Sequence, residues 1–386
     1  MLFFFFFAQM FAGLTTPERS SFQPQTIDSN VAIGYGIALG DVDGDKKPDI
    51  LMADKKQFVW YRNGDWKKFV MAENLTQNDN VCIAAEDING DGKVEVAVGA
   101  QWNPSETKDE KKSGSVHFLI RPEDPTQLWK PVTLYHEVTI HRMRWLKSSN
   151  GNIYLVVLPL HGKDNTDGAG KAVNMLVFQY PALLEKEAPA HIISTGMHLT
   201  HNFDISNLKG PGKKLIYIAG KEDLGIIDPD FSAPAKLTLL KMRGIEGAGE
   251  VRLSAPGAGK FVTTIEPMHG NKLVVYTNEG NNRQVLDSNL NEGHALVVAD
   301  LLGQGNDQVV SGWRKPDKDG KVGVKLYRKN PASATGWEQQ WVDENGMACE
   351  DLQVMDLNGD GRLDIIASGR STHNLKIYWN ILHGKK

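Results

Sequence analysis

The chain has 386 residues and a formal net charge of −4, with 43 Lys and Arg against 47 Asp and Glu. This balance offers no basic surface to a nucleic acid, so we expect no nucleic-acid partner. Only two cysteines occur, Cys82 and Cys349. That number excludes a disulfide-dense scaffold, and we interpret both as free, small core residues.

The first residues, MLFFFFFAQMFAGLTT, form one apolar run. The run is too short to span a bilayer and is typical of the apolar core of a signal peptide. It lacks a basic start, and Phe11-Ala12-Gly13 is a poor cleavage site, so a cropped or misassigned start is the alternative. We predict a signal peptide over residues 1–20 and one domain over 21–386. The protein is then exported (periplasmic, cell-surface or secreted), with no transmembrane segment after the signal region.

Seven segments of the chain follow one pattern, in which two apolar strands are joined by a turn. Four of them have a turn rich in Asp, Asn and Gly, and they begin at Gly36, Cys82, His294 and Glu350. The other three lack the acidic turn, and they begin at His141, His201 and Glu250. Copies at intervals of 44 to 60 residues indicate radial repetition, with one small sheet per copy.

Two further strands are expected in each copy. A third apolar strand often follows, as at Gln57 and Leu375, and a fourth precedes the next copy, as at Trp337. The last copy ends near Asn380 without a fourth strand, whereas residues 22–28 resemble the segment at Trp337. The sequence therefore predicts an all-β fold, a seven-bladed β-propeller of four-stranded blades. The N-terminal strand closes the ring, which leaves no open sheet edge.

Three of the turns between the first and second strands carry oxygen ligands at D-x-[DN]-x-D-x-x-x-[DE] spacing. They are Asp41, Asp43, Asp45 and Asp49; Asp87, Asn89, Asp91 and Glu95; and Asp356, Asn358, Asp360 and Asp364. Such spacing wraps hard oxygen atoms around one cation, so we predict a Ca²⁺ ion in each turn. These turns resemble the calcium loops of FG-GAP/VCBS propellers. The simplest role of the ion is to pin the turn, without part in any chemistry.

The opposite ends of the first strands predict a second site. Six residues before the Asp that opens the turn, or at the matching place, the copies carry Tyr35, Val81, His141, His201, Glu250, His294 and Glu350. These side chains are expected to surround one mouth of the central channel. Packing alone does not explain three histidines and two glutamates at one structural position.

The ends of the second strands lead to the same mouth. They carry His161, His269, Arg314, Arg370 and His373. Neutral imidazoles with carboxylates suit Zn²⁺ or another divalent transition metal, or a proton-transfer pair. Any one histidine can be a hydrogen-bonded rim residue, but His141, His201 and His294 as a set favour a metal site. His117, His136, His191 and His383 fall outside this pattern, and we expect them to be structural or on the surface.

Most tryptophans recur at strand positions where they pack blades together, as Trp60 and Trp145 do. Trp102 and Trp313 lie close to the rim in the sequence pattern, and only these two are candidates for stacking on a sugar.

Several rim segments resemble the propeller domain of the aldos-2-ulose dehydratase family. They are Thr139-IHRMRW, Leu158-PLHG, Thr200-HNF, Ile265-EPMHGN and Gly293-HALVVAD, and the similarity spans about residues 30 to 380. The resemblance implies a metal-dependent lyase that removes water from keto-sugars. In the fungal enzyme further domains follow the propeller, and an activity lodged there, such as an isomerase step, is not implied.

Elimination next to a carbonyl needs a base, an electrophile and an acid. We expect Glu250 or Glu350 to be the base, a transition metal on the histidines the electrophile, and His161 or His269 the acid. Tyr35, Arg314, Arg370 and His373 are candidates to bind the carbohydrate-derived small molecule. The alternative is a non-catalytic exported propeller that binds carbohydrate or protein, with calcium only structural.

Overall fold

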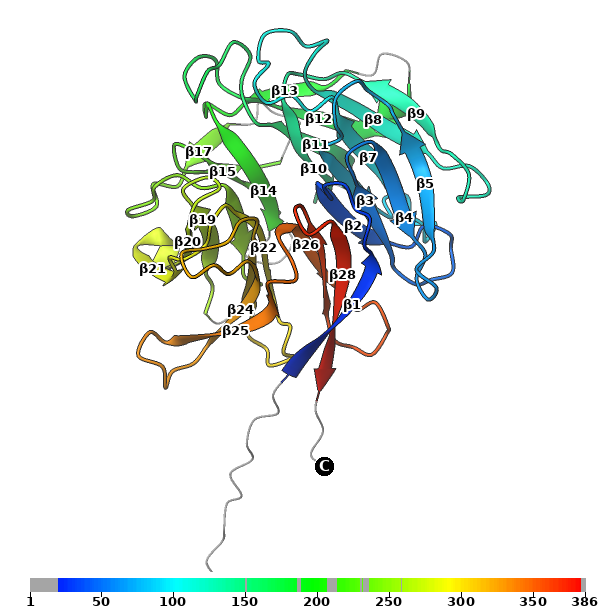
Figure 1. Ribbon diagram of the computed structural model, residues 1–386. Coiled ribbons are helices and arrows are strands. Elements are labelled where there is room, and N and C mark those ends of the chain that lie inside the picture. Colours follow the sequence, from blue (N-terminus) through cyan, green and yellow to red (C-terminus); the bar gives the residue numbers. More distant parts are fainter. Residues whose placement is uncertain are drawn as a thin grey trace, which may run out of the picture.

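The computed structural model describes residues 20–149, 151–185, 189–206, 214–229, 231, 236–257 and 259–382. The predicted signal peptide lies outside these residues except for Ser20, and so does His383. Seven four-stranded antiparallel sheets surround a central channel (Figure 1). This arrangement confirms the predicted seven-bladed β-propeller.

The strands of each blade are given from the channel outward. Blade one has β2 (Gly36–Gly40), β3 (Asp49–Ala53), β4 (Gln57–Tyr61) and β5 (Lys68–Glu73). Blade two has β6 (Cys82–Glu86), β7 (Glu95–Ala100), β8 (Ser115–Ile120) and β9 (Lys130–Leu134). Blade three has β10 (Ile140–Lys147), β11 (Ile153–Pro159), β12 (Asn174–Tyr180) and β13 (His191–Ser194). Blade four has β14 (Thr200–Ser206), β15 (Leu215–Gly220), β16 (Leu224–Ile227) and β17 (Leu237–Leu239).

The remaining blades complete the ring. Blade five has β18 (Glu250–Leu253), β19 (Val262–Glu266), β20 (Lys272–Thr277) and β21 (Asn282–Asp287). Blade six has β22 (Gly293–Ala299), β23 (Gln308–Trp313), β24 (Gly323–Lys329) and β25 (Trp337–Glu344). Blade seven has β26 (Cys349–Met355), β27 (Asp364–Gly369), β28 (Asn374–Leu382) and β1 (Ser20–Asp28). The described helices are two short 3₁₀ turns, Ala182–Leu184 and Asn278–Gly280, and neither is long and apolar enough to cross a membrane.

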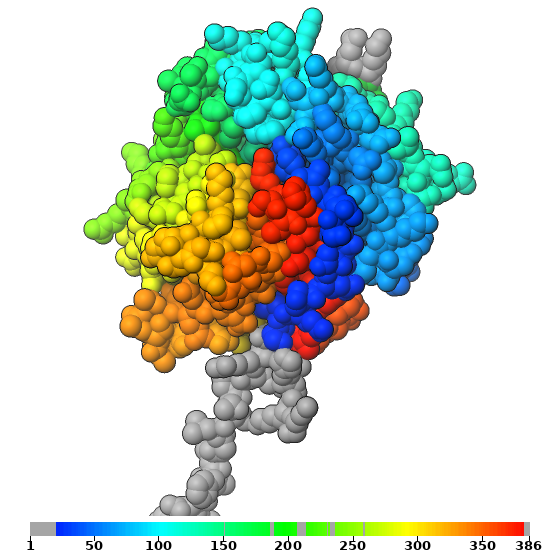
Figure 2. Space-filling view, viewed as in Figure 1, coloured from blue at the N-terminus to red at the C-terminus, as the bar shows by residue number. Residues whose placement is uncertain are grey.

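The ring is closed by the N-terminal strand, as predicted. Strand β1 pairs antiparallel with β28, with Gln23 opposite Trp379 and Asp28 opposite Leu375. The blue N-terminal atoms lie directly beside the red C-terminal ones in Figure 2. The last blade is therefore built from both ends of the chain.

A tyrosine–aspartate hydrogen bond joins three pairs of neighbouring blades. Each tyrosine lies on the third strand of one blade and donates to a carboxylate on the fourth strand of the preceding blade. The pairs are Tyr61 with Asp28 at 2.7 Å, Tyr327 with Asp287 at 2.8 Å, and Tyr378 with Asp343 at 2.7 Å. A lysine also binds each carboxylate, so these buried hydroxyls and carboxylates are satisfied.

The hydrophobic core lies between adjacent blades. One cluster, for example, joins Phe118 of blade two to Trp145 and Phe178 of blade three. Both cysteines are free and buried in such clusters, as the sequence suggested. Trp313 is also fully buried, and it packs beside Trp341. The expectation that Trp313 offers a sugar-stacking surface is therefore wrong.

Candidate functional site

Four inner strands carry a β-bulge at the same place. His141 in β10, His294 in β22 and Glu350 in β26 are each an extra residue without a partner in the adjacent strand. In β14 both His201 and Asn202 leave the regular pairing. A bulge bends its strand and re-aims the extra side chain, and bulges are frequent beside active sites. Glu250, by contrast, stays in register opposite Ile265.

Each of the three bulged histidines is fixed by a backbone carbonyl from the next blade. The Nδ1 atom of His141 lies 2.7 Å from the carbonyl oxygen of His201, and that of His294 lies 2.5 Å from the carbonyl of Glu350. The Nδ1 atom of His201 lies 2.9 Å from the carbonyl of Gly249. A carbonyl only accepts, so Nδ1 carries the hydrogen and Nε2 keeps its lone pair. This tautomer is the one that binds metal through Nε2.

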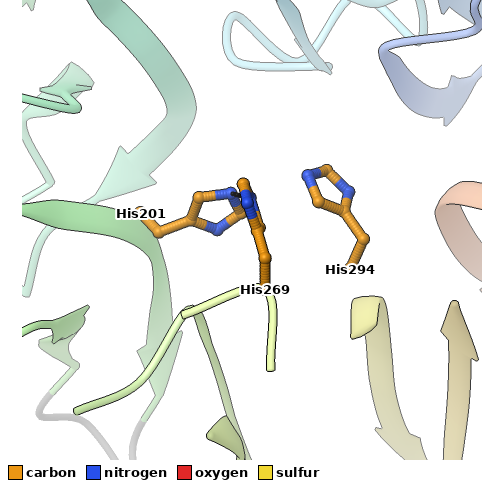
Figure 3. A group of neighbouring side chains, drawn as sticks. All are labelled: His201, His269 and His294. Carbon is orange, nitrogen blue, oxygen red and sulfur yellow. Dashed lines mark hydrogen bonds between the residues drawn. The ribbon is translucent and has the colours of Figure 1, made fainter. Parts of the chain in front are cut away.

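A fourth histidine joins this group from a loop. His269 lies between β19 and β20, and its Nε2 is 2.7 Å from Nε2 of His201. Ligand atoms of His201, His269 and His294 all lie within 4.8 Å of one another, and Figure 3 shows the three rings converging. The ring of His141 is 4.5 Å from that of His201 and 5.0 Å from Trp102. We call these four residues the histidine cluster.

Burial keeps the histidine cluster neutral. Desolvation lowers the pKa of His141, His201, His269 and His294, because the charged imidazolium loses its water. The positive charge of Arg142 lowers all four pKa values further. Neutral imidazoles with fixed tautomers are suited to a divalent transition metal, which would replace the proton now shared between His201 and His269. The residues present therefore fit such an ion.

The two candidate bases differ in how fully their carboxylates are occupied. Glu250 accepts hydrogen bonds from Asn202 on both oxygens, at 3.0 and 2.8 Å, and contacts Arg252 at 3.3 Å and His201 Nδ1 at 3.2 Å. Burial would raise the pKa of Glu250, but the bonds from His201 and the charge of Arg252 outweigh it, so the net pKa is lowered. Glu250 is thus an anchored, ionised carboxylate.

Glu350 keeps one oxygen available. Its Oε1 accepts from Arg370 at 3.1 Å, and its Oε2 lies 3.5 Å from Arg314. Among the described residues, Oε2 is buried and has no hydrogen-bond partner. A buried acceptor without a partner is costly, and it marks a place where a ligand or water belongs.

The predicted substrate-binding residues are only partly gathered around Glu350. The guanidinium of Arg370 lies 5.5 Å from the centre of the Tyr35 ring, whose hydroxyl donates to Asp79 at 3.1 Å. Arg314 pairs with Glu292 at 3.0 Å. His373 is different, because it is exposed and its Nδ1 lies 3.0 Å from the carbonyl of Val31.

The sequence pattern predicted that His161 lies at the same mouth as the histidine cluster. In the structure its contacts are with other residues. Its backbone N–H donates to the Thr139 hydroxyl, and it forms an isolated β-bridge with Leu199. Its Nδ1 is buried without a hydrogen-bond partner among the described residues. Burial lowers its pKa. The structure therefore gathers His269, and not His161, with the bulged histidines.

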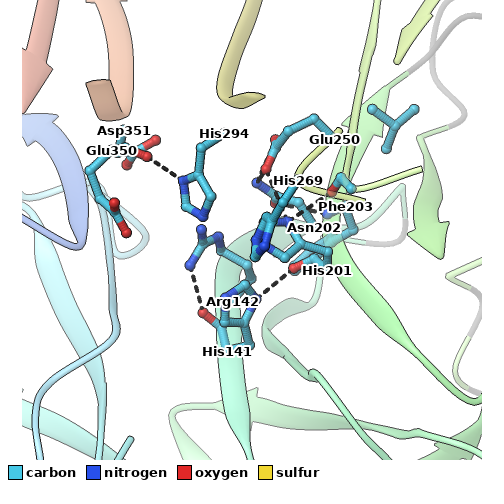
Figure 4. A network of polar contacts seen from close by, with 12 residues as sticks. His141, Arg142, His201, Asn202, Phe203, Glu250, His269, His294, Glu350 and Asp351 are labelled. Atoms are coloured by element: carbon cyan, nitrogen blue, oxygen red, sulfur yellow. Dashed lines mark hydrogen bonds and ion pairs between the residues drawn. The ribbon is translucent and has the colours of Figure 1, made fainter. Parts of the chain in front are cut away.

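Sequence reasoning missed three residues that follow the bulges. Arg142, Asn202 and Asp351 come directly after His141, His201 and Glu350, and with Tyr35 they line a cavity of about 40 Å³ in the channel. Strict alternation along a strand points such neighbours away from the channel. The bulge breaks that alternation, and no local residue pattern announces it. Figure 4 shows Arg142 within the histidine group.

The acidic turns lie at the other end of the inner strands. Carboxylate oxygens of Asp41, Asp43 and Asp49 lie within 4.8 Å of one another. The pKa of Asp49 is raised to about 7, mainly by burial and also by the charges of Asp43 and Asp45, against two backbone hydrogen bonds that lower it. Burial and mutual repulsion make these clustered carboxylates harder to ionise. A bound cation such as Ca²⁺ would favour their ionised form.

The other two turns share with the first the backbone hydrogen bonds to the opening aspartate. Asp87 and Asp356 each accept backbone hydrogen bonds from two glycines of their own turn, at 2.7 to 3.0 Å. In the second turn the amide nitrogen of Asn89 donates to Glu95 at 2.8 Å, and its amide oxygen accepts the backbone hydrogen of Asp91 at 2.8 Å. The predicted ligands of each turn are therefore held together by the backbone.

Comparison with known proteins identifies the repeats and the fold. The FG-GAP-like repeat family matches residues 41–98, and the FG-GAP repeat family matches residues 83–119. Such repeats are typical of extracellular proteins. No curated protein sequence matches the chain.

Solved structures are similar over nearly the whole chain. A chain in the crystal structure of the Mitotic Checkpoint Complex has 10% identity and a TM-score of 0.60, over 99% of this chain and 98% of that one. BBS1N, in the crystal structure of its complex with ARL6DN, has 13% identity and a TM-score of 0.58, over 94% of this chain and 97% of the matched one. At these identities the similarity concerns the fold alone. The chain is thus a seven-bladed β-propeller that carries FG-GAP repeats.

Proposed function

We propose that the protein is a metal-dependent lyase that eliminates water or another leaving group from a keto-sugar or an oxidised glycan fragment at the channel mouth. One observation carries the proposal: ring nitrogens of His201, His269 and His294 converge, in one network with Glu350, whose Oε2 has no hydrogen-bond partner among the described residues. The sequence resemblance to aldos-2-ulose dehydratases agrees with it.

The metal and the histidines supply the electrophile. A bound divalent transition metal such as Zn²⁺ supplies a Lewis acid that polarises a substrate carbonyl. His201, His269 and His294 would hold it through Nε2, and His141 is a candidate fourth ligand. His141 also orients His201, because its Nδ1 donates to the backbone carbonyl of that residue.

Glu350 is the base that the contacts favour. Its free Oε2 takes the proton next to the substrate carbonyl, while Arg314 and Arg370 pair with the carboxylate and orient it. Glu250 is a positioning residue, since its oxygens are occupied by Asn202 and Arg252.

The leaving group needs a proton donor. Burial lowers the pKa of His161 and His269, so neither holds an extra proton at neutral pH. The protonated Glu350 is the remaining donor. It returns the proton as the carbon–oxygen bond breaks, so that water leaves, a carbon–carbon double bond forms and the carboxylate is restored.

The surroundings suit an exported, calcium-stabilised protein. Ca²⁺ bound by the turns at Asp41, Asp87 and Asp356 would stabilise the scaffold, and FG-GAP repeats favour export. Trp102, beside His141, offers a ring on which a sugar can stack.

The test combines metal analysis with an activity assay. Wild-type protein should retain Zn²⁺ or a similar ion after dialysis and convert 1,5-anhydrofructose to a conjugated enone seen by ultraviolet absorbance. His201→Ala and the loop variant His269→Ala should lose both properties, and His191→Ala, on outer strand β13, should keep them. Wild-type protein that retains no transition metal would instead favour the non-catalytic binding propeller.

A further inference from the structure

The channel beneath the histidine cluster contains arginines without carboxylate partners. Arg142 and Arg144 lie two residues apart on β10, and both line the cavity of about 40 Å³. Among the described residues, no carboxylate lies within 4.0 Å of either guanidinium. Arg142 donates to the carbonyl of His141 at 3.1 Å, and Arg144 donates to the carbonyl of Phe203 at 2.9 Å. Their charges are therefore not neutralised by direct contact.

A third arginine, Arg252, lies in the cavity, and its charge is offset by Glu250, which lies 3.3 Å from it. Arg252 also lowers the pKa of Arg144, after the larger effect of burial. The one carboxylate in the lining is Asp351, whose two oxygens accept the backbone hydrogens of Ile37 at 2.8 Å and Leu352 at 2.9 Å. Asp351 is thus held by the backbone. The charges of Arg142 and Arg252 act on its pKa, but no ion pair within 4.0 Å joins it to an arginine among the described residues, and the cavity favours an anion.

The charge balance of the histidine cluster also favours an anion. Its four members are neutral ligands, so a divalent ion bound there keeps both positive charges. Arg142 lies next to His294 in Figure 4, and its charge acts on His294 and on His269. A positive ion beside an arginine that has no carboxylate partner favours a negative occupant of the site.

We propose that the cavity lined by Arg142, Arg144 and Arg252 binds a carboxylate of the substrate, so that the site is selective for acidic sugars over neutral ones. This inference rests on the proposed function, whose substrate class it narrows. A volume of about 40 Å³ admits a carboxylate group but not a sugar ring. The ring itself would lie at the channel mouth, between the histidine cluster and Glu350.

The binding experiment uses metal-free protein, with D-glucuronate, D-glucose and acetate as probes in calorimetric titrations. Wild type should bind glucuronate, bind acetate at least about tenfold more weakly, and show no heat with glucose. Arg142→Gln should weaken glucuronate binding by about tenfold to a hundredfold, because a charged hydrogen bond is lost. Arg142→Lys keeps the charge and should retain part of the affinity. Arg62→Gln, whose side chain pairs with Asp65 on an exposed turn, should behave as wild type.

The kinetic experiment separates this inference from the proposed function. With a keto-uronate, Arg142→Gln should raise KM and leave kcat within a few-fold, and its effect on KM for a neutral keto-sugar should be smaller. Arg62→Gln, on an exposed turn, should leave KM and kcat unchanged with both substrates. Equal affinity for glucose and glucuronate, or acetate as tight as glucuronate, would overturn the inference. A metal-loaded enzyme that prefers neutral keto-sugars would also overturn it while the lyase proposal stands. If the protein binds glucuronate but retains no transition metal, the acidic-sugar inference stands and the lyase proposal fails.

Discussion

The Nδ1 atom of His294 lies 2.5 Å from the backbone carbonyl of Glu350. Because both residues are β-bulges of neighbouring blades, one hydrogen bond connects a proposed metal ligand to the proposed base. The carbonyl of Glu350 is available for this bond since its residue has left the pairing with β27. The geometry of the site is therefore set by backbone irregularities as well as by side chains.

The first prediction separates the two glutamates. Glu350→Gln should reduce turnover by about 10² to 10⁴-fold and leave metal affinity within a few-fold, because it removes the base but keeps the backbone carbonyl. Glu250→Gln should instead weaken metal binding by about 10 to 100-fold, because Glu250 orients His201 and Asn202. Calorimetric metal titration and steady-state kinetics on both variants check this. Loss of metal in Glu350→Gln with full metal in Glu250→Gln would contradict the assignment.

The second prediction concerns ring closure and its pH dependence. Burial would raise the pKa of Asp28, but hydrogen bonds from Tyr61, from the Asn30 backbone and from Lys68 outweigh it, so the pKa is lowered. A lowered carboxyl pKa stabilises the fold above the pKa of the unfolded chain and loses this effect as the pH falls through the folded value. Asp28→Asn should therefore reduce the free energy of unfolding by about 1 to 3 kcal/mol at pH 7.

The measurement is denaturant unfolding of wild type and Asp28→Asn between pH 7 and pH 3. The difference between them should shrink once the pH falls below about 4, the usual range of an unfolded aspartate. Tyr61→Phe should show the same trend, because it removes the donor of the same hydrogen bond. A difference that stays constant to pH 3 would count against an ionised Asp28 as the source.

The fold was predictable because the sequence contains seven copies of one strand pattern, and each copy forms one blade. The apolar strand pairs around Asp41 and Asp87 carry their own turns, and the end at Asn380 exposes the missing fourth strand that residues 22–28 supply. The turns can be recognised from local sequence, and the missing fourth strand can be recognised when the copies are compared. Pairing of the two ends of the chain then follows from the need to close a ring.

The site was predictable only in part. Equivalence of position brought His201 and His294 together, and the ends of the second strands placed His269 at the same mouth. The sequence assigned His269 as a candidate acid, whereas the structure places it beside the other two histidines, from the loop after β19. Equivalence of position missed Arg142, since a bulge depends on how two strands pair and has no fixed signature in one strand. The prediction for Trp313 was also wrong, because its ring packs in the interface between blades and not at the rim.

The third prediction concerns calcium. A chelator should lower the melting temperature of calcium-loaded protein, since an ion that binds only the native state adds about 2.7 kcal/mol per site at a hundredfold excess over Kd. Asp356→Asn should reduce this sensitivity, because Asp356 organises its turn through Gly359 and Gly361. Asp300→Asn is the matched control. Its turn has Gln308 where the other turns have a carboxylate, so chelator sensitivity should not change. Equal effects of the two variants would argue against ion binding at Asp356.

The last prediction tests whether the bulges belong to the site or to the fold. His294 is an extra residue between Gly293, which pairs with Trp313, and Ala295, which pairs with Gly312. Deleting it should leave a regular strand in the same register, so folding should survive with a melting temperature within several degrees of wild type, while transition-metal binding is lost. Deleting Val297 from the same strand is the control. Val297 pairs with Val310 in the regular ladder, and its loss shifts the following residues by one, which turns core side chains toward the channel and channel side chains toward the core. That variant should fail to fold or melt far below wild type. Circular dichroism and metal analysis of the two deletions distinguish the cases. If both deletions unfold the protein alike, the bulge is required by the fold, and its place beside the histidine cluster no longer supports a catalytic role.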